Sequence, residues 1–479
     1  MVDVILIHSP IILYKDEKEK EKFRGHGGDE KSFYPTGILY MAAFLERFGH
    51  SVKIIDVAPE GITLPDILQT IKNEKPMVVG ISSMTTSIAS AVSLAKAIKE
   101  KFGDSFHLGL GGVHLCCDKT FLERFPVFDF GIIGEGEHTF EEIVSKIKKG
   151  EKVRGPIIGK ITEDLDSLPF PARHLIKPEI YLREEQMKYE VPSAGILGSR
   201  GCPFKCIFCC IPVIGFKLRL RSAKNIVDEM EQVYDQCQGS YGFNDDCFTL
   251  NKKYIMDFCQ EVIDRKLKIK FIASTRASVV DDEVAKALRR AGCYELYFGV
   301  ESGNERIRNE IIKKKVDDQQ ITKAVELCRK YRIMSNLFLM VGFPTETRKE
   351  MLDTVKIGSK VKADVIGIHI TMPFPGTEVF NYAIKHKMIP EDIIDKYASG
   401  ELGKGFRGIW PLFIPKGSTL EDLVNIKKMA YRRFFINPMW LLRRIRIWFL
   451  IPRRFKEDLK LFKIAFYVFM RGGTKGQLS

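Results

Sequence analysis

The sequence lacks any long apolar run. None of its hydrophobic stretches reaches the roughly 18 residues that a helix needs to cross a bilayer. The opening residues, MVDVILIHSPIILYKDEKEK, have neither the basic start nor the cleavage site of a signal peptide. The 11 cysteines are an odd number in a chain of 479 residues and do not form the dense pattern of a secreted disulfide framework. We therefore expect a cytoplasmic protein in a reducing compartment.

Acidic residues are in the minority and are scarcest near the end of the chain. The 75 lysines and arginines outnumber the 61 acids, which gives a net charge of +14. Between residues 432 and 471 there are 11 basic residues and only 2 acids. Such a basic segment is typical of contact with an anionic partner, such as a membrane surface, an acidic substrate or nucleic acid. A solvated helical surface is the alternative.

Strand and helix patterns alternate over residues 1–150. Short apolar runs at 2–7, 52–57, 77–82, 107–110 and 128–133 are separated by helix-period segments at 37–48, 64–72, 88–101, 119–125 and 139–149. Five such units predict an α/β domain, a parallel sheet with helices on both faces, in which ligands lie beyond the carboxyl ends of the strands. Because 479 residues exceed one hydrophobic core, we expect two or three domains in all.

A second alternating series follows a connector at residues 151–192, where LDSLPFPAR places two prolines in three residues. Its expected strands are 194–198, 241–244, 268–274, 295–300, 336–341 and 365–371. Six βα units are more than a flavodoxin-like sheet usually has and fewer than the eight of a full barrel. We therefore expect a partial, open (βα)6 barrel at 193–398 and a basic helical extension at 399–479.

Three cysteines stand close together directly after the first strand of this second series. Cys202, Cys206 and Cys209 have the spacing C-x3-C-x2-C and lie at the expected mouth of the barrel, where βα loops build active sites. Three thiolates so spaced can hold an iron–sulfur cluster and leave one iron open to a substrate. Structural zinc is the alternative, but zinc usually needs a fourth Cys or His. Cys210 is badly placed for that role, and His369 is far away in the sequence.

The stretch CPFKCIFC resembles the CxxxCxxC signature of the radical S-adenosylmethionine (SAM) superfamily, whose fold is a partial (βα)6 barrel. The resemblance implies a 4Fe–4S cluster whose open iron binds SAM, and one-electron cleavage of SAM to a 5′-deoxyadenosyl radical. The electron would come from a low-potential donor such as flavodoxin or ferredoxin. The cofactors carry the difficult chemistry, and the protein shields and directs the radical.

Other strand ends of the second series resemble SAM-binding segments of the same superfamily, in the same order. The resemblance implies that Asp245 and Asp246 are candidates for contact with the SAM amino group. It implies contacts from Ser274 and Arg276 to the SAM carboxylate and ribose, and from Glu301 to the ribose. VGFPTE, at residues 341–346, resembles the segment near the adenine. No residue is assigned as a general acid or base.

The first domain contains no complete dinucleotide-binding fingerprint, because His114 stands where the last glycine of G-x-G-x-x-G belongs. It resembles instead the cobalamin-binding domain found before many radical SAM barrels, through YPTG (34–37), GISSMTT (80–86), GGVH (111–114) and GEGEHT (134–139). Glycines let the backbone approach a bulky ligand, and hydroxyls can bond its amide arms. The expected cobalamin contacts are Ser82, Ser83, Thr85, Gly111, Gly112, His114, Gly134 and Glu135.

One motif of cobalamin proteins is missing. The D-x-H-x-x-G pattern that supplies a lower axial histidine in methionine synthase-like proteins is absent. The resemblance therefore points to base-off cobalamin without a histidine ligand. His114 is then either a contact to the nucleotide tail or a loop histidine satisfied by backbone. Cys116 and Cys117 are expected to be packing residues. A degenerate domain that has lost cobalamin is the alternative.

The C-terminal segments 438–450 and 459–470 mix apolar residues with arginine and lysine. They predict either helices that lie in a membrane interface, apolar face down, or a helix packed over the mouth of the barrel. Nucleic acid is not expected as a partner, because no RNA-binding module is recognisable.

These features predict a cobalamin-dependent radical SAM methyltransferase that acts on an unactivated carbon of a small-molecule or lipid-like substrate. The first alternative is a ring-forming or oxidative enzyme without methyl transfer, resembling the anaerobic cyclase of bacteriochlorophyll synthesis. The second is a non-catalytic cobalamin-binding sensor with a vestigial barrel, and the intact cysteine triad argues against it.

Overall fold

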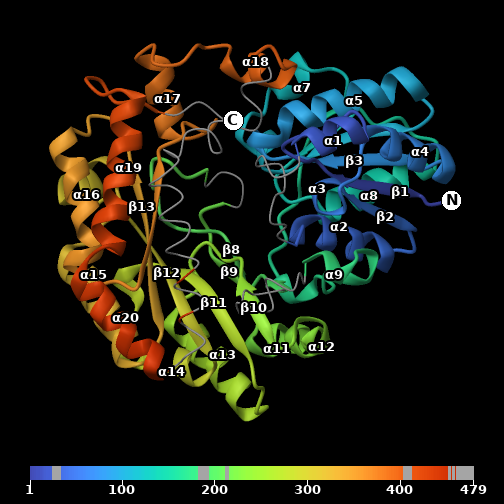
Figure 1. Cartoon of the computed structure of the whole chain (residues 1–479). Helices are drawn as coiled ribbons and strands as arrows, with labels where there is room; N and C mark the ends of the chain where they lie inside the picture. Colours follow the sequence, from blue (N-terminus) through green and yellow to red (C-terminus); the bar gives the residue numbers. More distant parts are fainter. Residues whose placement is uncertain are drawn as a thin grey trace.

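The computed structural model describes residues 1–23, 34–181, 194–210, 215–402, 413–450, 455 and 459. Two sheets of six strands organise the chain (Figure 1). The first lies in the blue, N-terminal part and the second in the green-to-orange part. A third, antiparallel pair, β8 (Ser199–Arg200) and β9 (Arg219–Leu220), lies near the border between them.

The first sheet has the order β2-β1-β3-β4-β5-β6, and all neighbouring strands are parallel. Its strands are β1 (Val4–His8), β2 (Val52–Asp56), β3 (Val78–Ser82), β4 (His107–Gly111), β5 (Phe130–Ile133) and β6 (Gly155–Ile158). The helices are α1 (Glu17–Phe23), α2 (Thr36–Arg47), α3 (Val57–Glu60), α4 (Leu64–Glu74), α5 (Ile88–Phe102), α6 (Val113–Cys117), α7 (Phe121–Arg124) and α8 (Glu137–Lys148). The strand order reverses between β1 and β3, and ligands bind at such reversals.

Strand β1 shows why helices cover both faces of this sheet. Ile5 and Ile7 belong to a buried cluster with residues of α4 and α5. Val4 and Leu6 point the other way, into a cluster with residues of α2 and α8. A parallel strand buried on both faces must be apolar at nearly every position, which the VILI run of β1 satisfies. The expected doubly covered sheet is confirmed.

The expected connector contributes the sixth strand, β6. This strand pairs with β5 at the edge of the sheet and contains Pro156. Proline has no backbone N–H, so it is tolerated in a sheet mainly at an edge. A short run with a proline does not predict a strand from sequence alone, which explains why β6 was not expected.

The second sheet has the order β14-β13-β12-β11-β10-β7, again parallel throughout. Its strands are β7 (Ala194–Ile196), β10 (Ser240–Phe243), β11 (Lys270–Thr275), β12 (Cys293–Glu301), β13 (Met334–Val341) and β14 (Val365–Ile370). Its helices are α11 (Ala223–Gln232), α12 (Tyr234–Cys237), α13 (Lys252–Asp264), α14 (Asp282–Arg290), α15 (Asp318–Lys330) and α16 (Arg348–Lys360). Among the described strands β14 and β7 do not pair with each other, so the barrel is partial and open, as expected.

The two sheets are joined by an apolar junction. Helices α17 (Glu378–Lys385) and α18 (Ile393–Ser399) follow the barrel and contribute to the same buried cluster as α4 and α5 of the first domain. Figure 1 shows α18 beside α7 and α5. The Tyr397 hydroxyl donates to the carbonyl oxygen of Thr86 at 2.7 Å, and Arg124 pairs with Asp395 at 2.7 Å. The carboxyl ends of the two sheets are thereby held together.

The C-terminal helix does not cover the barrel mouth. Helix α19 (Leu420–Phe435) packs on α16 and β14, and α20 (Pro438–Leu450) continues to the far end of the barrel (Figure 1). The Trp440 Nε1–H donates at 3.0 Å to the carbonyl oxygen of Asp364, which precedes β14. The expected packing over the mouth is therefore wrong for α20, because Trp440 packs against Phe434 and Phe435 and directs the helix to the opposite end.

The second expected C-terminal segment is described at Leu459 alone. Residues 460–470 of the second expected segment lie outside the described part of the chain. Among the residues that the structure describes, no helix is both long and apolar enough to cross a membrane.

Candidate functional site

The three spaced cysteines lie on the loop that follows β7 and β8, at the carboxyl edge of the second sheet. All three are free thiols; Cys202 and Cys206 are half-buried and Cys209 is exposed. The Cys209 N–H donates to the carbonyl oxygen of Cys206 at 3.0 Å, so the loop turns between these two residues. Although the Cys209 side chain reaches solvent, the surrounding loop partly desolvates its thiol; this desolvation, followed by the carboxylate of Asp246 and the neighbouring cysteines, raises the pKa of Cys209 to about 12.

This donor set fits an iron–sulfur cluster rather than a preformed ion cage. Within the described residues, no group of three His, Cys, Asp or Glu side chains already converges on a metal position. Thiolates at a site that disfavours negative charge need a positively charged centre beside them, and iron supplies it. Cys202, Cys206 and Cys209 would therefore close around the cluster as it forms.

The two aspartates after β10 have different surroundings. Asp245 is buried and accepts hydrogen bonds from the Gly198 N–H at 2.9 Å and from the Ser199 hydroxyl. Burial raises the pKa of Asp245 to about 7, although these two hydrogen bonds oppose the shift. Asp246 is exposed and lines the large cavity described below. Asp245 thus supports the start of the cysteine loop, and only Asp246 is open to a ligand.

Two of the SAM-type residues, Arg276 directly after β11 and Glu301 at the end of β12, contact one lysine. Glu301 and Lys314 are both buried, and the Lys314 Nζ donates to the Glu301 Oε1 at 2.8 Å. The Arg276 guanidinium lies 3.5 Å from the ring centroid of Phe204 in the cysteine loop and donates to the Lys314 carbonyl oxygen. Ser274 is half-buried on the same sheet. Sequence reasoning missed Lys314, because it stands in the run KKK without a recognisable motif.

A cavity of about 500 Å³ runs along the carboxyl edge of the first sheet and reaches the second domain. The residues that line it include Ser82, Gly111, Gly112, Gly134 and Glu135 from the first domain, and Ser199, Arg200, Asn244 and Asp246 from the second. The cobalamin-type loops of the first domain and Asp246, which lies beside the cysteine loop, therefore line one cavity.

The glycines of this cavity have two different roles, and one of them leaves room for a bulky ligand. A Cβ atom on Gly111 would meet nothing within 4 Å, so it would project into the space that such a ligand needs. Deeper in the cavity, a Cβ on Gly80 would come within 3.1 Å of Leu6, and one on Gly109 within 2.4 Å of Phe130. Gly80 and Gly109 therefore make room for the Leu6 and Phe130 side chains, and Gly111 is the position where the space beside the backbone is open to a ligand.

Three of the expected cobalamin contacts lie beneath the cavity wall instead. Ser83, Thr85 and His114 are buried. The His114 Nδ1 lies 3.2 Å from the Thr85 hydroxyl, and its Nε2 has no partner among the described residues. Burial lowers the pKa of His114 to about 4, so the ring is neutral at pH 7. The sequence left open a backbone partner or a contact to the nucleotide tail for His114; the Thr85 hydroxyl is the partner of one ring nitrogen.

The carboxylate of Glu135 is already occupied by the other domain. It pairs with Arg219 on β9 and lies 3.3 Å from Arg200, while Arg200 pairs with Glu137 at 2.5 Å. All four side chains are buried or nearly so. Burial alone would raise the pKa of Glu135, but the hydrogen bond from Arg219 and the charge of Arg200 lower it overall. We call Glu135, Glu137, Arg200 and Arg219 the interdomain clamp; neither arginine carries a sequence signal.

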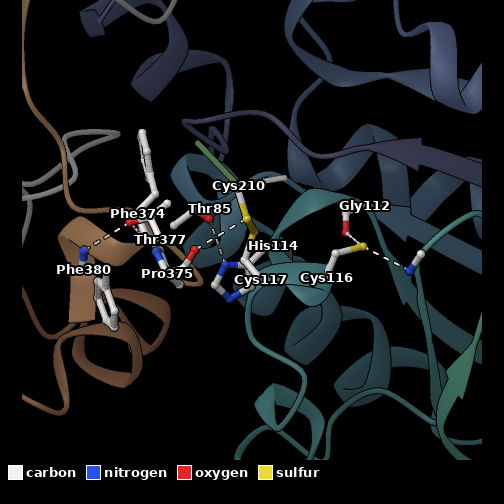
Figure 2. The surroundings of a disulfide bond; sticks show 11 residues. Thr85, Gly112, His114, Cys116, Cys117, Cys210, Phe374, Pro375, Thr377 and Phe380 are labelled. Carbon is white, nitrogen blue, oxygen red and sulfur yellow. Dashed lines mark hydrogen bonds between the residues drawn. A yellow bond between two sulfur atoms is a disulfide. The ribbon is translucent and has the colours of Figure 1, made fainter. Parts of the chain in front are cut away.

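A disulfide bond also joins the two domains beside the cysteine loop (Figure 2). It links Cys117, at the end of α6, to Cys210, which directly follows Cys209. The Cys210 Sγ lies 3.7 Å from the carbonyl oxygen of Pro375. The expectation that Cys117 only packs is therefore wrong, because α6 brings it to the cysteine loop. Cys116 is a buried packing residue as expected, and its Sγ accepts the Gly134 N–H at 3.1 Å.

Comparison with known families identifies both domains. A family model described as Radical SAM superfamily matches residues 196–357, and one described as B12 binding domain matches residues 30–144. An uncharacterized methyltransferase of Pyrococcus horikoshii is 31% identical over 448 residues, which cover 89% of this chain and 94% of the relative. The anaerobic magnesium-protoporphyrin IX monomethyl ester cyclase of Rubrivivax gelatinosus is 24% identical over 85% of this chain and 74% of its own length.

Solved structures share the fold. The radical SAM methyltransferase TsrM from Kitasatospora setae, solved with cobalamin and a 4Fe–4S cluster, has a TM-score of 0.63 at 18% identity, over 81% of this chain and 75% of its own. The cobalamin-dependent enzyme OxsB, solved with cobalamin and SAM, has a TM-score of 0.67 at 15% identity, over 99% of this chain and 76% of its own. The two matched domain types imply a 4Fe–4S cluster, SAM and cobalamin as cofactors. The chain therefore belongs to the cobalamin-dependent radical SAM enzymes.

Proposed function

We propose that this enzyme transfers a methyl group from SAM, by way of cobalamin, to an unactivated carbon of a small organic molecule. The observation that carries the proposal is the shared cavity, onto which Gly111 and Gly134 of the first domain open together with Asp246 of the second. When bound, the cluster and SAM supply a 5′-deoxyadenosyl radical, and cobalamin supplies the methyl group. The chain's task is to hold both cofactors against one substrate carbon.

The proposed cluster and SAM contacts come from the second domain. Cys202, Cys206 and Cys209 would hold the cluster. Asp246 would accept hydrogen bonds from the SAM amino group, since it is exposed beside the cysteines while Asp245 supports their loop. Ser274, Arg276 and Glu301 are the remaining proposed SAM contacts. Lys314 would orient the Glu301 carboxylate through their 2.8 Å ion pair.

The proposed cobalamin contacts come from the first domain. Ser82, Gly111, Gly112 and Gly134 line the cavity and would face the cofactor. Ser83, Thr85 and His114 would support the loop that carries Gly112, because they are buried directly behind it. Glu135 would act through the interdomain clamp rather than as a direct ligand, since Arg219 and Arg200 occupy its carboxylate.

The domain limits proposed for this function are 1–150 for cobalamin, 151–192 for the connector, 193–398 for the barrel and 399–479 for the basic extension. The reducing power would come from a low-potential flavodoxin or ferredoxin, in the cytoplasm.

Four exposed apolar side chains support an additional, peripheral contact of α20 and the turn before it with a membrane: Ile436, Met439, Leu442 and Ile445. Co-sedimentation of the full chain with anionic vesicles tests that contact; a Leu442→Lys variant should lose it, and equal sedimentation of both proteins would contradict it.

SAM cleavage tests the proposed function. The protein is reconstituted anaerobically with iron, sulfide and cobalamin, then given SAM and a strong reductant. Formation of 5′-deoxyadenosine is expected, and a Cys206→Ala variant should lose it. Cys259→Ala, which changes a buried cysteine on α13 far from the loop in sequence, is the matched control. A wild-type protein that binds the cluster but forms no 5′-deoxyadenosine would contradict the proposal.

A ring-forming reaction without methyl transfer is the second candidate. It is favoured by the magnesium-protoporphyrin cyclase relative, which aligns over 85% of this chain. SAM labelled in its methyl group separates the two candidates, because only the methyltransferase moves the label into the product.

A further inference from the structure

The inner face of the second sheet carries side chains that the described helices do not cover. Alternate residues of β12 and β13, such as Phe298 and Leu337, are buried against the outer helices. The intervening residues point to the other face. Phe338 is 37% exposed there, although its strand lies inside the sheet, between β12 and β14. A large apolar ring in this position is available to a ligand.

Phe338 belongs to an aromatic surface with an open side. Its ring stacks on that of Tyr297, with centroids 5.1 Å apart and planes 8° from parallel. Its backbone partners in the two neighbouring strands are Gly299 and Gly367. A Cβ atom on Gly367 would lie 3.5 Å from the Phe338 Cδ1 and 3.8 Å from the His369 Nε2. An atom of a ligand placed over Gly367 would therefore touch both rings at van der Waals distance.

Two polar groups border this surface. No described residue forms a hydrogen bond with the His369 ring or with the Tyr297 hydroxyl. Burial, then the charge of Lys427 on α19, lowers the pKa of His369, while Glu301 opposes the shift. The neutral imidazole offers one N–H donor and one acceptor nitrogen.

The same surface borders the proposed SAM site. A Cβ atom on Gly299, the backbone partner of Phe338 in β12, would lie 2.5 Å from the Glu301 Oε1 and 2.8 Å from the Lys314 Nζ, so the Glu301–Lys314 ion pair borders this surface. His369 lies on β14 in register with Met340 of β13, two residues beyond the level of Phe338 and on the same face of the sheet. A molecule on this surface would thus lie beside SAM and not at the far end of the barrel.

We infer that Tyr297, Phe338, Gly367 and His369, here called the Phe338 platform, bind the methyl acceptor, and that the acceptor is a planar unsaturated ring with a hydrogen-bonding heteroatom. The inference rests on the proposed function and names its substrate class. Flat rings stack favourably on an aromatic face. A saturated lipid would leave the imidazole and the hydroxyl unpaired on burial, which costs binding free energy. The lipid-like substrate expected from the sequence is the less suitable occupant.

Binding of defined probes tests the platform. Reconstituted full-length enzyme with cluster, cobalamin and SAM is dialysed against 3-methylindole or protoporphyrin IX, which are planar, and against squalane, which is saturated. At least one planar probe should bind and squalane should not. Phe338→Leu should weaken planar binding about three- to tenfold, the range of one lost aromatic stack. Phe338→Tyr should restore it, and Phe48→Leu, which alters an exposed ring on the first domain, should have no effect.

The alternative occupant of the platform is the adenine of SAM. In that case Phe338→Leu would weaken SAM binding and leave the planar probe unaffected, which would overturn the inference. Binding of squalane alone, or of neither planar probe, would overturn it as well. Formation of 5′-deoxyadenosine is measured on the same preparations. If it persists while the planar probes fail to bind, only the platform is refuted; if it is absent from the wild type, the proposed function fails first.

Discussion

The interdomain clamp should contribute measurably to the stability of the contact between the two domains. Glu135→Gln removes the carboxylate charge that pairs with Arg219 and Arg200, and these side chains are between 5% and 10% exposed. Loss of one partner of a buried ion pair costs about 3–5 kcal/mol, because the other charge remains buried. In the variant, Arg200 still forms its ion pair with Glu137, and Arg219 still donates a hydrogen bond to the carbonyl oxygen of Thr162. We therefore expect the lower end, about 3 kcal/mol.

Hydrogen exchange measures this change locally. A loss of about 3 kcal/mol should speed exchange of the β8–β9 amides by roughly 100-fold, since each 1.4 kcal/mol is a factor of ten. The effect should persist at high salt, because the pair is buried. Glu163→Gln is the matched control: it removes an exposed pair with Lys217, whose side chains are 73% and 63% exposed, and should change exchange by less than about fivefold. Equal exchange in the two variants would refute the reasoning.

Three further predictions concern the cofactors and the buried histidine. Cys202→Ala should abolish the iron–sulfur absorbance of the reconstituted protein, and Cys259→Ala should keep it; equal iron content in both would contradict the assignment. Gly111→Val should weaken cobalamin binding roughly tenfold, because its methyl groups would enter the cavity, without lowering the melting temperature, since no atom lies within 4 Å of the added Cβ. Unchanged binding in an equilibrium titration would count against cobalamin at this edge. The pKa of His114 falls from 6.5 to about 4 on folding, so the unfolded chain binds the proton more tightly. Stability should therefore fall by about 3 kcal/mol as the pH drops from 6.5 to 4, and His114→Gln should flatten that part of the denaturation profile.

The parts of the fold with regular patterns were predictable from the sequence. Every expected strand of both sheets formed within a few residues, because apolar runs such as VILI in β1 have only one way to bury both faces in a parallel sheet. The edge strand β6 was not predicted. Its proline is compatible with a strand only at the edge of a sheet, and the sequence does not show which strand lies at the edge. The path of α20 depends on where Trp440 finds a partner, and sequence periodicity contains no such information.

For the site, sequence indicated the loops but not what each side chain does. Cys202, Cys206 and Cys209 lie within eight residues of the chain, so their spacing alone pointed to a cluster. Asp245 and Asp246 are neighbours with opposite environments, and only the fold separates the buried one from the exposed one. The pairing of Cys117 with Cys210 joins residues 93 positions apart, which depends on how the two domains meet.

The most direct test of the central claim follows the methyl group. Reconstituted enzyme is incubated anaerobically with SAM carrying a deuterated methyl group, a low-potential reductant and the planar ring compound that the binding experiment selects. We expect a product in which a deuterated methyl group replaces one hydrogen, formed together with 5′-deoxyadenosine. Formation of 5′-deoxyadenosine and an altered ring compound without the label would contradict methyl transfer and favour the ring-forming reaction.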